Sequence, residues 1–432
     1  MTKGRLMMTS RFVTLFLFLG ACSTVASTPD SARTPTLSPP VAEGGAPVAS
    51  ENPFEAWKRA FINKAVAQGF DRGFVEAQLK DVVPQASVVR ADSSQPEFSR
   101  PVSVYIRNAV SQARIDGGRA RLSANNNVGF IEASSGVPAA ILGGIWGMES
   151  DFGRVQGDID AVTAFATLAC DGRRRDWAEA QLLYTLTAIR DGKAPRERLK
   201  GSWAGAMGQT QFLPENYLKL ALDGDGDGVV DIWGSASDSL ASAANLLNKA
   251  GWQRGQAWAV EVTLPDGFDY YLAETESRTP LWWAEQGVLR ADSAGWTDDE
   301  KAVNATLILP AGAQGPAFLA LPNHYVIRKY NNSTAYALAV GLIADGIAGK
   351  PGLKTPWPDE TPLSLEQRKN TQTALNSLGF KAGAVDGVIG VGTRTALREW
   401  QKANGRPADG YLTPELAEEL AQKIPGSYSA AY

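Results

Sequence analysis

The sequence predicts a mainly α-helical protein with two folded units, and three observations support this fold class. Apolar residues recur at three- and four-residue spacings from Pro53 onward, which is the period of an amphipathic helix. The composition is that of a globular chain, with 44% hydrophobic and 20% charged residues. The 432 residues exceed one typical domain of about 150 residues, and a Pro- and Gly-rich stretch over 349–363 divides them.

The first unit, 53–348, begins with an amphipathic helix that carries Phe54, Trp57 and Phe61. Two short β-strands are expected in its less regular part, at 260–264 and 325–328. Tight Asp-Gly turns predict three short helices in the second unit, 364–424, which a tail over 425–432 follows. Further helices of the first unit are expected over 102–116, 137–150, 176–190, 214–221, 238–250 and 334–346.

The composition excludes several classes of function. His324 is the single histidine, so a His-rich zinc site cannot form and a Ser-His or Cys-His pair has one possible base. Lys and Arg total 42 against 46 Asp and Glu, and no basic block indicates nucleic-acid binding. With only Cys22 and Cys170, no disulfide framework is expected.

The N-terminus predicts export. Basic residues precede the apolar run 12–20, which is too short to span a bilayer but suits a secretory signal over 1–22. The run ends Leu-Gly-Ala-Cys, which resembles a bacterial lipobox, so we expect Cys22 to be lipidated; a chance cysteine at a cleavage site is the alternative. Ser23 resembles the outer-membrane sorting signal, and 23–52 has the Ser-, Pro- and Ala-rich composition of a flexible tether.

The segment 136–153 is the best candidate for catalysis. Pro138 suits the first turn of a helix, an apolar run follows, and Glu149 ends that run shortly before Gly153. An acid at the edge of a hydrophobic core should have a raised pKa, because desolvation disfavours its carboxylate, and it could then act as a general acid. The alternative is that Glu149 faces water at a helix end.

Three segments then carry a family resemblance: 136–153, with its Gly-Val-Pro start and Gly-Met-Glu-Ser-Asp-Phe-Gly end, 202–214, and 330–336. Together they resemble, in order, the signatures of the membrane-bound lytic murein transglycosylase B family over about 53–348. The resemblance implies a lysozyme-like α-rich catalytic domain with minor β structure. It also implies cleavage of the β-1,4 bond between N-acetylmuramic acid and N-acetylglucosamine, leaving a 1,6-anhydromuramic acid end.

In that mechanism Glu149 alone protonates the glycosidic oxygen and then accepts the proton of the C6 hydroxyl. No cofactor is required for this chemistry. A hydrolytic muramidase would need a second carboxyl, for which Asp151, Asp158 and Asp160 are near in sequence, although surface or capping roles are preferred for them. A non-catalytic peptidoglycan-binding lipoprotein is the other alternative.

The resemblance also implies substrate-binding residues with hydrogen-bonding or charged side chains. Arg174 and Arg175 would hold peptide carboxylates, or would instead lie in solvent at the start of a helix. One departure from the family pattern is Leu246, where a tyrosine is usual after Ala-Asn. The implied residues are Ser202, Gln211, Tyr330, Asn331, Tyr336, Arg174, Arg175 and, as a weaker match, Tyr105.

An Asp- and Gly-rich loop begins at Asp223 and has the spacing of a calcium loop. Asp223, Asp225 and Asp227 occupy positions 1, 3 and 5, and Val229 would supply a carbonyl oxygen at position 7. The Glu usual at position 12 is absent, and in the resembled family a later Asp, here Asp238, completes the site. We therefore expect a structural Ca²⁺, with a metal-free turn as the alternative.

The second unit, 364–424, resembles the type 1 peptidoglycan-binding domain. Gln372, the Leu-Gly-Phe at 378–380, the Asp-Gly-Val-Ile-Gly at 386–390 and Trp400 fall at the spacing of that family. Asp386 and Gly387 are expected to form a turn without contacting ligand, even if the module binds glycan. The expected partner is the glycan strand of peptidoglycan, and the expected location is the periplasmic face of the outer membrane.

Overall fold

The computed structural model describes residues 52–93 and 101–424. Contacts divide the chain into residues 1–51 and 52–432, and the described residues belong to the second unit. The expected signal peptide, Cys22, the tether up to residue 51 and the tail 425–432 lie outside the described residues.

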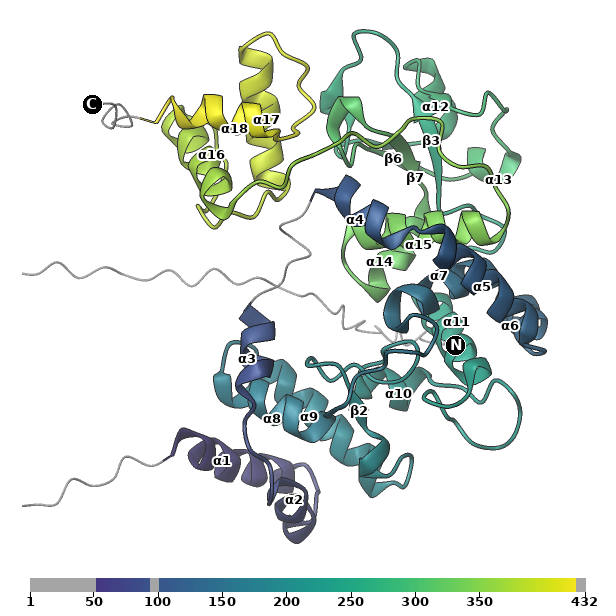
Figure 1. Ribbon diagram of the computed structural model, residues 1–432, viewed down its shortest axis with the longest axis vertical. Coiled ribbons are helices and arrows are strands. Elements are labelled where there is room, and N and C mark those ends of the chain that lie inside the picture. Colours follow the sequence, from purple (N-terminus) through teal and green to yellow (C-terminus); the bar gives the residue numbers. More distant parts are fainter. Residues whose placement is uncertain (1–51, 94–100, 425–432) are drawn as a thin grey trace, which may run out of the picture. The chain divides into compact units, whose positions relative to one another are not determined.

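The predicted mainly α class is confirmed (Figure 1). In the expected catalytic unit, the helices over 137–150, 176–190, 214–221, 238–250 and 334–346 are all present within a few residues of their predicted bounds. The helices of this unit are α1 (Pro53–Ala67), α2 (Arg72–Leu79), α3 (Ala86–Ser93), α4 (Val102–Ala109), α5 (Gln112–Ala124), α6 (Val128–Ser135), α7 (Ala139–Ser150), α8 (Ala161–Asp171), α9 (Arg175–Arg190), α10 (Pro214–Leu220), α11 (Ala236–Lys249), α12 (Pro280–Glu285), α13 (Asp298–Lys301), α14 (Pro322–Tyr330) and α15 (Thr334–Ile347).

The predicted helix 102–116 is two helices, α4 and α5. Val110 leaves helical geometry with ψ 78°, and the side chain of Ser111 then accepts a hydrogen bond from the backbone N–H of Arg114 as the N-cap of α5. Serine is a favoured N-cap because its hydroxyl satisfies an N–H that has no partner within the helix. The break therefore occurs at a start signal inside the helical pattern.

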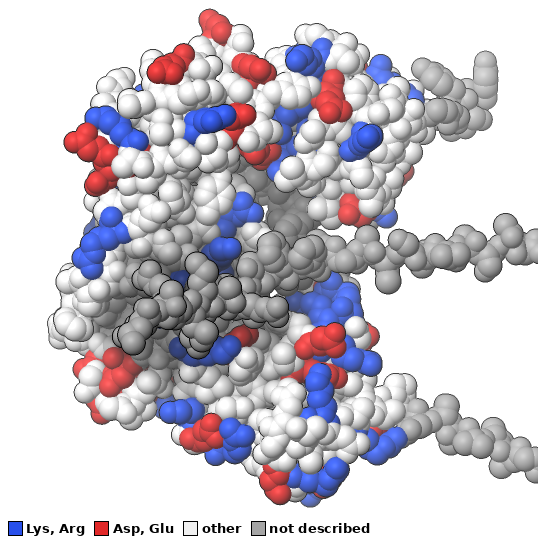
Figure 2. Space-filling view, turned by 180° about the vertical axis from the view of Figure 1, so that it is seen from behind, with Lys and Arg blue, Asp and Glu red and all other residues white. Residues whose placement is uncertain are grey.

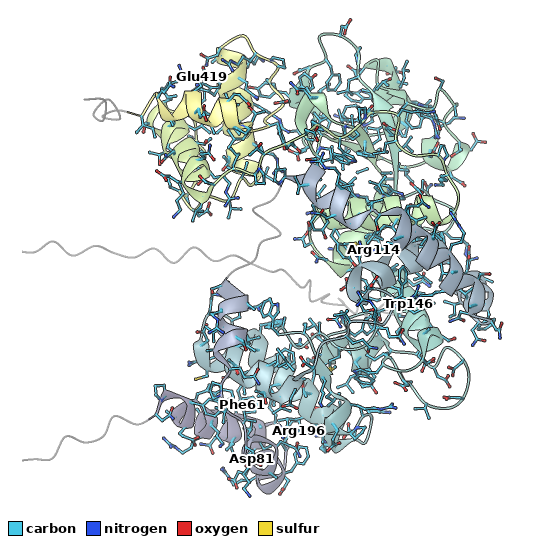
Figure 3. All side chains as sticks on the ribbon, in the orientation of Figure 1. Phe61, Asp81, Arg114, Trp146, Arg196 and Glu419 are labelled. Atoms are coloured by element: carbon cyan, nitrogen blue, oxygen red, sulfur yellow. The ribbon has the colours of Figure 1, made fainter. Side chains whose placement is uncertain are left out.

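Two apolar clusters hold the helical part together. One gathers side chains of α1, α8 and α9, including Phe61, and the other gathers side chains of α7, α11 and α15, including Trp146. Both residues are labelled in Figure 3. The second cluster surrounds α7, whose residues 141–147 are all buried. This burial on every side explains why the α7 sequence is apolar around its whole circumference.

Helices α7 and α15 approach unusually closely. A Cβ atom at Gly144 of α7 would lie 2.6 Å from the backbone oxygen of Val340 on α15. Only glycine therefore allows this separation. The contact places the C-terminal end of α7 beside the N-terminal turn of α15.

A five-stranded antiparallel sheet has the order β4-β6-β7-β3-β5. Its strands are β3 (Ala259–Thr263), β4 (Ser277–Arg278), β5 (Leu289–Arg290), β6 (Ala305–Ile308) and β7 (Ala317–Ala320), and the separate pair is β1 (Ile159–Asp160) with β2 (Lys200–Gly201). Val260 pairs with Leu319, and Leu307 also pairs with Leu319. Figure 1 shows α12 beside this sheet, and the indole of Trp283 on α12 donates to the Ala305 carbonyl at 2.9 Å.

The strand expected at 260–264 is confirmed as β3, but the strand expected at 325–328 is wrong, because these residues lie in α14. Pro322 occupies the first turn of α14, where its missing N–H is not needed and its φ suits a helix. That start signal outweighs the local β preference of the β-branched pair Val326 and Ile327.

The expected three-helix module is also confirmed, with α16 (Leu365–Ser377), α17 (Val391–Ala403) and α18 (Pro414–Ala421). Ser364 and Gln367 form a capping box at the start of α16. Trp400 and Leu375 are buried in the small core of the module. Gln372 donates to the Asp386 carboxylate at 3.0 Å and accepts from the Gly387 N–H at 2.7 Å, so the Asp-Gly turn is tied to α16.

None of the described helices is by itself long and apolar enough to cross a membrane. The pair α6 and α7 meets the length and composition test together, but the two helices are bent by 112°. On the face shown in Figure 2, acidic side chains lie beside basic ones over much of the surface.

Candidate active site

The candidate catalytic carboxyl, Glu149, lies in the last turn of α7 and is partly buried. The helix ends immediately afterwards, because Asp151 adopts the left-handed conformation with φ 49°. Ser150 reinforces this end: its hydroxyl accepts the Gly153 N–H at 2.7 Å. The apolar body of α7 thus carries an acid to the edge of the core, as its sequence predicts.

Tyr336 is the direct partner of Glu149. Its phenol donates to Glu149 Oε1 at 2.5 Å, from the first turn of α15. Tyr336 is only 3% exposed, and burial raises its pKa well above the ordinary value, with the neighbouring Glu149 carboxylate adding to the effect. Tyr336 therefore stays protonated and acts as a hydrogen-bond donor to the carboxyl.

Two more of the predicted tyrosines lie near this pair. Tyr330 ends α14, and its hydroxyl donates to the Thr210 carbonyl at 2.5 Å. Burial first, and then the charge of Glu149, raise the pKa of Tyr330. Tyr105 on α4 packs against the same apolar cluster, and its charge when ionised raises the pKa of Tyr336. The structure thus brings Glu149, Tyr336, Tyr330 and Tyr105 together.

Ser202 and Gln211 lie in the segment 202–213, which runs past the end of α7. The Ser202 hydroxyl accepts the Ala206 N–H at 3.2 Å, which closes a turn. Gln211 has a positive φ of 52°, and its amide donates to the carbonyls of Gln156 at 3.0 Å and Gly208 at 2.9 Å. Both side chains thus support the shape of the segment, while Tyr330 joins it to α14 through Thr210.

The predicted peptide-binding arginines differ from each other. Arg174 is paired with Asp92, with Nη2 2.5 Å from Oδ1, and its guanidinium lies 4.5 Å and 5.5 Å from the ring centres of Trp177 and Trp203. Arg175 is exposed, and its Nε donates to the Ala169 carbonyl. Arg174 therefore supports Trp203, the neighbour of Ser202, whereas Arg175 faces solvent.

Asn331 is exposed and is the C-cap that follows α14, and its carbonyl accepts the Ser333 N–H at 2.7 Å. Leu246, which departs from the resembled pattern, is buried in the cluster around α8 and α9. The adjacent Asn245 donates to the Leu220 carbonyl at 2.8 Å.

Two of the three acids considered as a second carboxyl have structural partners. Asp151 pairs with Arg154 at 2.7 Å. Asp160 pairs with Arg196 at 3.0 Å and accepts the Thr163 N–H as the N-cap of α8. Asp158 is exposed. The surface and capping roles expected for Asp151 and Asp160 fit these contacts.

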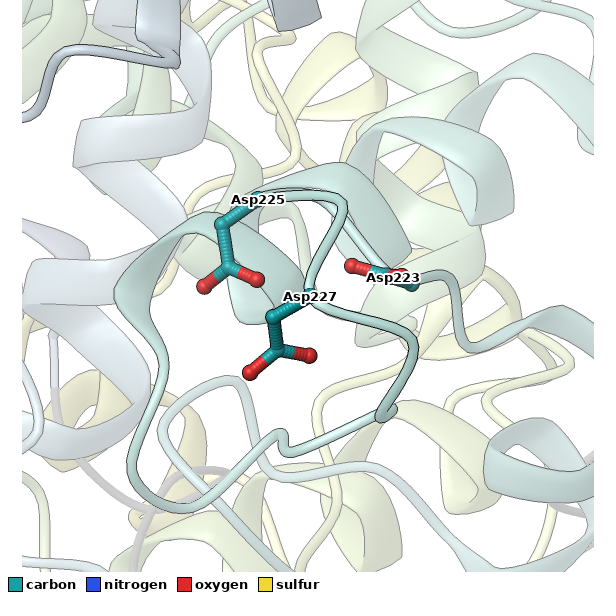
Figure 4. A group of neighbouring side chains, drawn as sticks. All are labelled: Asp223, Asp225 and Asp227. Atoms are coloured by element: carbon teal, nitrogen blue, oxygen red, sulfur yellow. The ribbon is translucent and has the colours of Figure 1, made fainter.

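The Asp-rich loop brings three carboxylates together (Figure 4). Asp223, Asp225 and Asp227 each offer an oxygen within 4.8 Å of the others. Asp223 also accepts the N–H groups of Gly226 and Gly228, which curls the loop around these oxygens. Hard oxygen donors in a curled loop of this kind fit Ca²⁺.

Asp238, the expected completing ligand, is not one of these three carboxylates. It lies in the first turn of α11 and is 1% exposed. Its two oxygens accept the N–H groups of Gly224 at 2.8 Å and Asp231 at 2.6 Å. Asp238 therefore ties both ends of the loop to α11. The Val229 carbonyl stays a predicted ligand.

The sequence interpretation missed the contacts that attach the segment 202–213 to α7. Gln209 accepts from the indole of Trp146 at 3.0 Å, and its carbonyl accepts from the Ser150 hydroxyl at 2.5 Å. Ser150 follows Glu149 directly, and Gln209 lies within the second resembled signature. Their position in the motifs was the available signal, but their pairing spans 59 residues and only the fold reveals it.

Two regions of the chain match known protein families. Residues 53–345 match the transglycosylase SLT domain family, and 364–420 match a peptidoglycan-binding domain family. The chain is 30% identical over 377 residues to membrane-bound lytic murein transglycosylase B of Escherichia coli, covering 78% of this chain and 98% of that protein.

Solved structures are similar as well. SltB3 of Pseudomonas aeruginosa, in complex with NAG-anhNAM-pentapeptide, has 46% identity and a TM-score of 0.81, covering 85% of this chain and 99% of that one. The Escherichia coli lytic transglycosylase Slt35 in complex with calcium has 30% identity and a TM-score of 0.58, covering 69% and 94%.

Proposed function

The chain belongs to the SLT-domain transglycosylase family, and we propose that it is a lytic transglycosylase of peptidoglycan with Glu149 as its catalytic carboxyl. It cleaves the β-1,4 bond between N-acetylmuramic acid and N-acetylglucosamine. The observation that carries this proposal is the 2.5 Å hydrogen bond from a protonated, buried Tyr336 to Glu149 at the end of an apolar helix.

Glu149 acts first as an acid and then as a base. Its carboxyl proton passes to the glycosidic oxygen while the bond from that oxygen to C1 of muramic acid breaks. The resulting carboxylate then accepts the proton of the C6 hydroxyl as O6 bonds to C1, which gives the 1,6-anhydro ring and restores the acid. Tyr336 orients the carboxyl in both steps, since its donor is bound to Oε1.

A single carboxyl is sufficient for this route, whereas an enzyme dedicated to hydrolysis with inversion or retention generally uses two. The ion pairs of Asp151 with Arg154 and of Asp160 with Arg196 support the transglycosylase over a muramidase. A non-catalytic wall-binding lipoprotein is less well supported, because it would not require an acid and a tyrosine donor in contact at this position.

The substrate is a peptidoglycan glycan strand. We infer that Tyr330, Asn331, Ser202, Gln211 and Tyr105 line the cleft around the scissile bond. Arg175, which is exposed, is the better placed of the two arginines to meet peptide carboxylates, while Arg174 acts next to Trp203. The complex of SltB3 with a disaccharide pentapeptide supports this substrate class.

The Asp-rich loop would hold a structural Ca²⁺ through Asp223, Asp225 and Asp227. The bound ion would neutralise three neighbouring carboxylates and thereby stabilise the loop. The calcium complex of Slt35 supports this proposal. The ion takes no part in the cleavage, which Glu149 performs.

The C-terminal module and the N-terminal cysteine would determine where the enzyme acts. The module 364–424 would bind the wall and keep the enzyme on its substrate. Lipidation of Cys22 would anchor the chain at the periplasmic face of the outer membrane, because multiple acyl chains each add about 0.8 kcal/mol per buried methylene. No nucleic-acid partner is proposed. The measured mass of the mature protein from membranes tests the lipid directly.

Mass spectrometry of the muropeptides released from isolated peptidoglycan by the purified chain tests the activity. Anhydromuramic ends are expected, and Glu149→Gln should abolish release while the thermal unfolding midpoint stays unchanged. Glu76→Gln, at an exposed position of α2, is the matched control and should retain full activity. Reducing ends would indicate a muramidase, and no release would indicate a wall-binding protein.

A further inference from the structure

Gln209 makes four hydrogen bonds to two other segments of the chain. Its side-chain oxygen accepts from the Trp146 indole at 3.0 Å, and its amide donates to the Trp233 carbonyl at 3.2 Å. Its backbone N–H donates to the Ile232 carbonyl at 2.9 Å, and its own carbonyl accepts from the Ser150 hydroxyl at 2.5 Å. Gln209 is 6% exposed, so water cannot readily replace these partners.

Two of these partners lie on either side of Glu149 on α7. Trp146 lies three residues before it, and Ser150 follows it directly. Residues three or four apart share one face of a helix, so fixing Trp146 and the end of the helix fixes both the rotation and the length of the last turn. That turn carries Glu149.

The side chain of Gln209 also packs closely against the chain that leaves α7. A Cβ atom at Gly153 would lie 2.6 Å from Gln209 Oε1. Gly153 has φ +82°, and its N–H donates to the Ser150 hydroxyl. The carboxamide of Gln209 is therefore enclosed between the indole of Trp146 and the turn that terminates the helix.

We propose that Gln209 is a positioning residue for Glu149: it holds the last turn of α7 against the segments 202–213 and 230–234, so that the carboxyl meets both Tyr336 and the glycosidic oxygen. This inference rests on the proposed function. The next residue, Thr210, accepts from Tyr330, so a shift of Gln209 would also move a tyrosine of the site.

A positioning role differs from simple structural support in what it predicts. Loss of support lowers the amount of folded enzyme and leaves the chemistry of each folded molecule unchanged. A misplaced Glu149 would slow proton transfer from the C6 hydroxyl, and water could then attack C1, giving a reducing muramic end and returning its proton to Glu149. The product ratio therefore separates the two roles.

The test compares Gln209→Met with Gln156→Met. Methionine keeps the length of the side chain and removes its hydrogen bonds. Gln156 is the matched control, because its amide also donates to the Trp233 carbonyl, at 3.1 Å, and to the Gly153 carbonyl, but to no residue of α7. Both variants of the full chain would be assayed on soluble uncrosslinked glycan strands for kcat, KM and the ratio of anhydro to reducing ends.

For Gln209→Met we expect kcat to fall at least tenfold, KM to stay within threefold of wild type and the fraction of reducing ends to rise. For Gln156→Met we expect kcat to stay within threefold of wild type. A kcat within threefold of wild type for Gln209→Met, or a loss that only follows the unfolded fraction with an unchanged product ratio, overturns the proposal. If wild type itself makes no anhydro ends, the proposed function fails first.

Trp146→Phe provides a second test, which does not depend on whether Gln209→Met folds. It removes the indole donor and part of the buried ring volume, and keeps an aromatic ring beside Phe152. In the positioning role the two substitutions act through one contact, so the double variant should be no slower than the slower single variant. Multiplicative losses in kcat would count against the shared contact.

Discussion

Replacing Tyr336 with Phe tests the contact between this residue and the candidate acid. The substitution removes one hydroxyl and keeps the ring, which is 3% exposed and packed in the cluster around α7. The hydroxyl donates to Glu149 Oε1 at 2.5 Å, within the range of charge-assisted hydrogen bonds. Such a bond contributes about 1.5–3 kcal/mol.

If that energy is expressed in the transition state, kcat falls by about 10- to 150-fold, because about 1.4 kcal/mol corresponds to a tenfold change in rate. The start of α15 should survive, since its cap is made by the Ser333 hydroxyl and the backbone N–H of residue 336. The assay is the initial rate on soluble glycan strands, together with the thermal unfolding midpoint of each variant.

Tyr217→Phe is the matched control for this experiment. Its hydroxyl is also buried and donates to the Lys193 carbonyl at 2.9 Å, on α10 and outside the group of Glu149 and its tyrosines. It should lose stability by about 1 kcal/mol and little rate. Equal rates for Tyr336→Phe and wild type, with both folded, would refute the claim that the phenol orients Glu149.

Three further outcomes are expected. Burial lowers the pKa of His324 to about 3, so between pH 6.5 and about 3 the unfolded chain binds one more proton than the native one. The free energy of unfolding should therefore fall by about 1.4 kcal/mol per pH unit as pH decreases through this range. Urea titrations should show a smaller slope for His324→Phe, and an unchanged slope would contradict the prediction. Calcium at about 100 times its Kd should stabilise the chain by about 2.7 kcal/mol in thermal unfolding, and Asp225→Asn should remove the response; no response in wild type would argue against a metal. Asp92→Asn should destabilise the fold by about 3 kcal/mol, because it leaves the Arg174 guanidinium, 16% exposed, without its charged partner. Denaturant midpoints near wild type would show that the pair contributes little.

The helices could be predicted largely from local signals. α7, α10, α11 and α15 each combine an apolar pattern with a start signal such as proline or a capping side chain, whereas α9 has no side-chain cap at Arg174 and follows from its apolar pattern alone. The errors arose where two local signals compete. At 325–328 a β-branched pair suggests a strand, but the helix begins three residues earlier at Pro322, and the helix is what forms.

The sheet was largely beyond prediction from sequence. Its strands are two to five residues long, and their partners are distant in the chain, as when β3 pairs with both β5 and β7. A strand of two residues has no periodicity to read. Register in such a sheet is set by the buried faces of β6 and β7 once the fold is formed.

In the candidate site, too, local features could be predicted from sequence and contacts between distant residues could not. Glu149 can be found from sequence because the signal is local: an apolar helix that ends in an acid. The partnership with Tyr336 spans 187 residues, and family resemblance suggested only that both belong to one cleft. Asp238 was expected from the family resemblance to complete a metal site, and the fold adds what sequence could not supply, namely that its oxygens accept two backbone N–H groups of the loop.

The close packing of α7 and α15 explains how these distant residues meet. Gly144 lets the backbones approach until a Cβ would be 2.6 Å from the Val340 oxygen. Tyr336 lies one turn before Val340, and Glu149 lies more than one turn after Gly144, so the antiparallel helices carry both side chains to the same end of the contact. A wider separation would leave the phenol short of the carboxyl. Gly144 is therefore part of the proposed catalytic arrangement, because it sets the separation at which Tyr336 reaches Glu149.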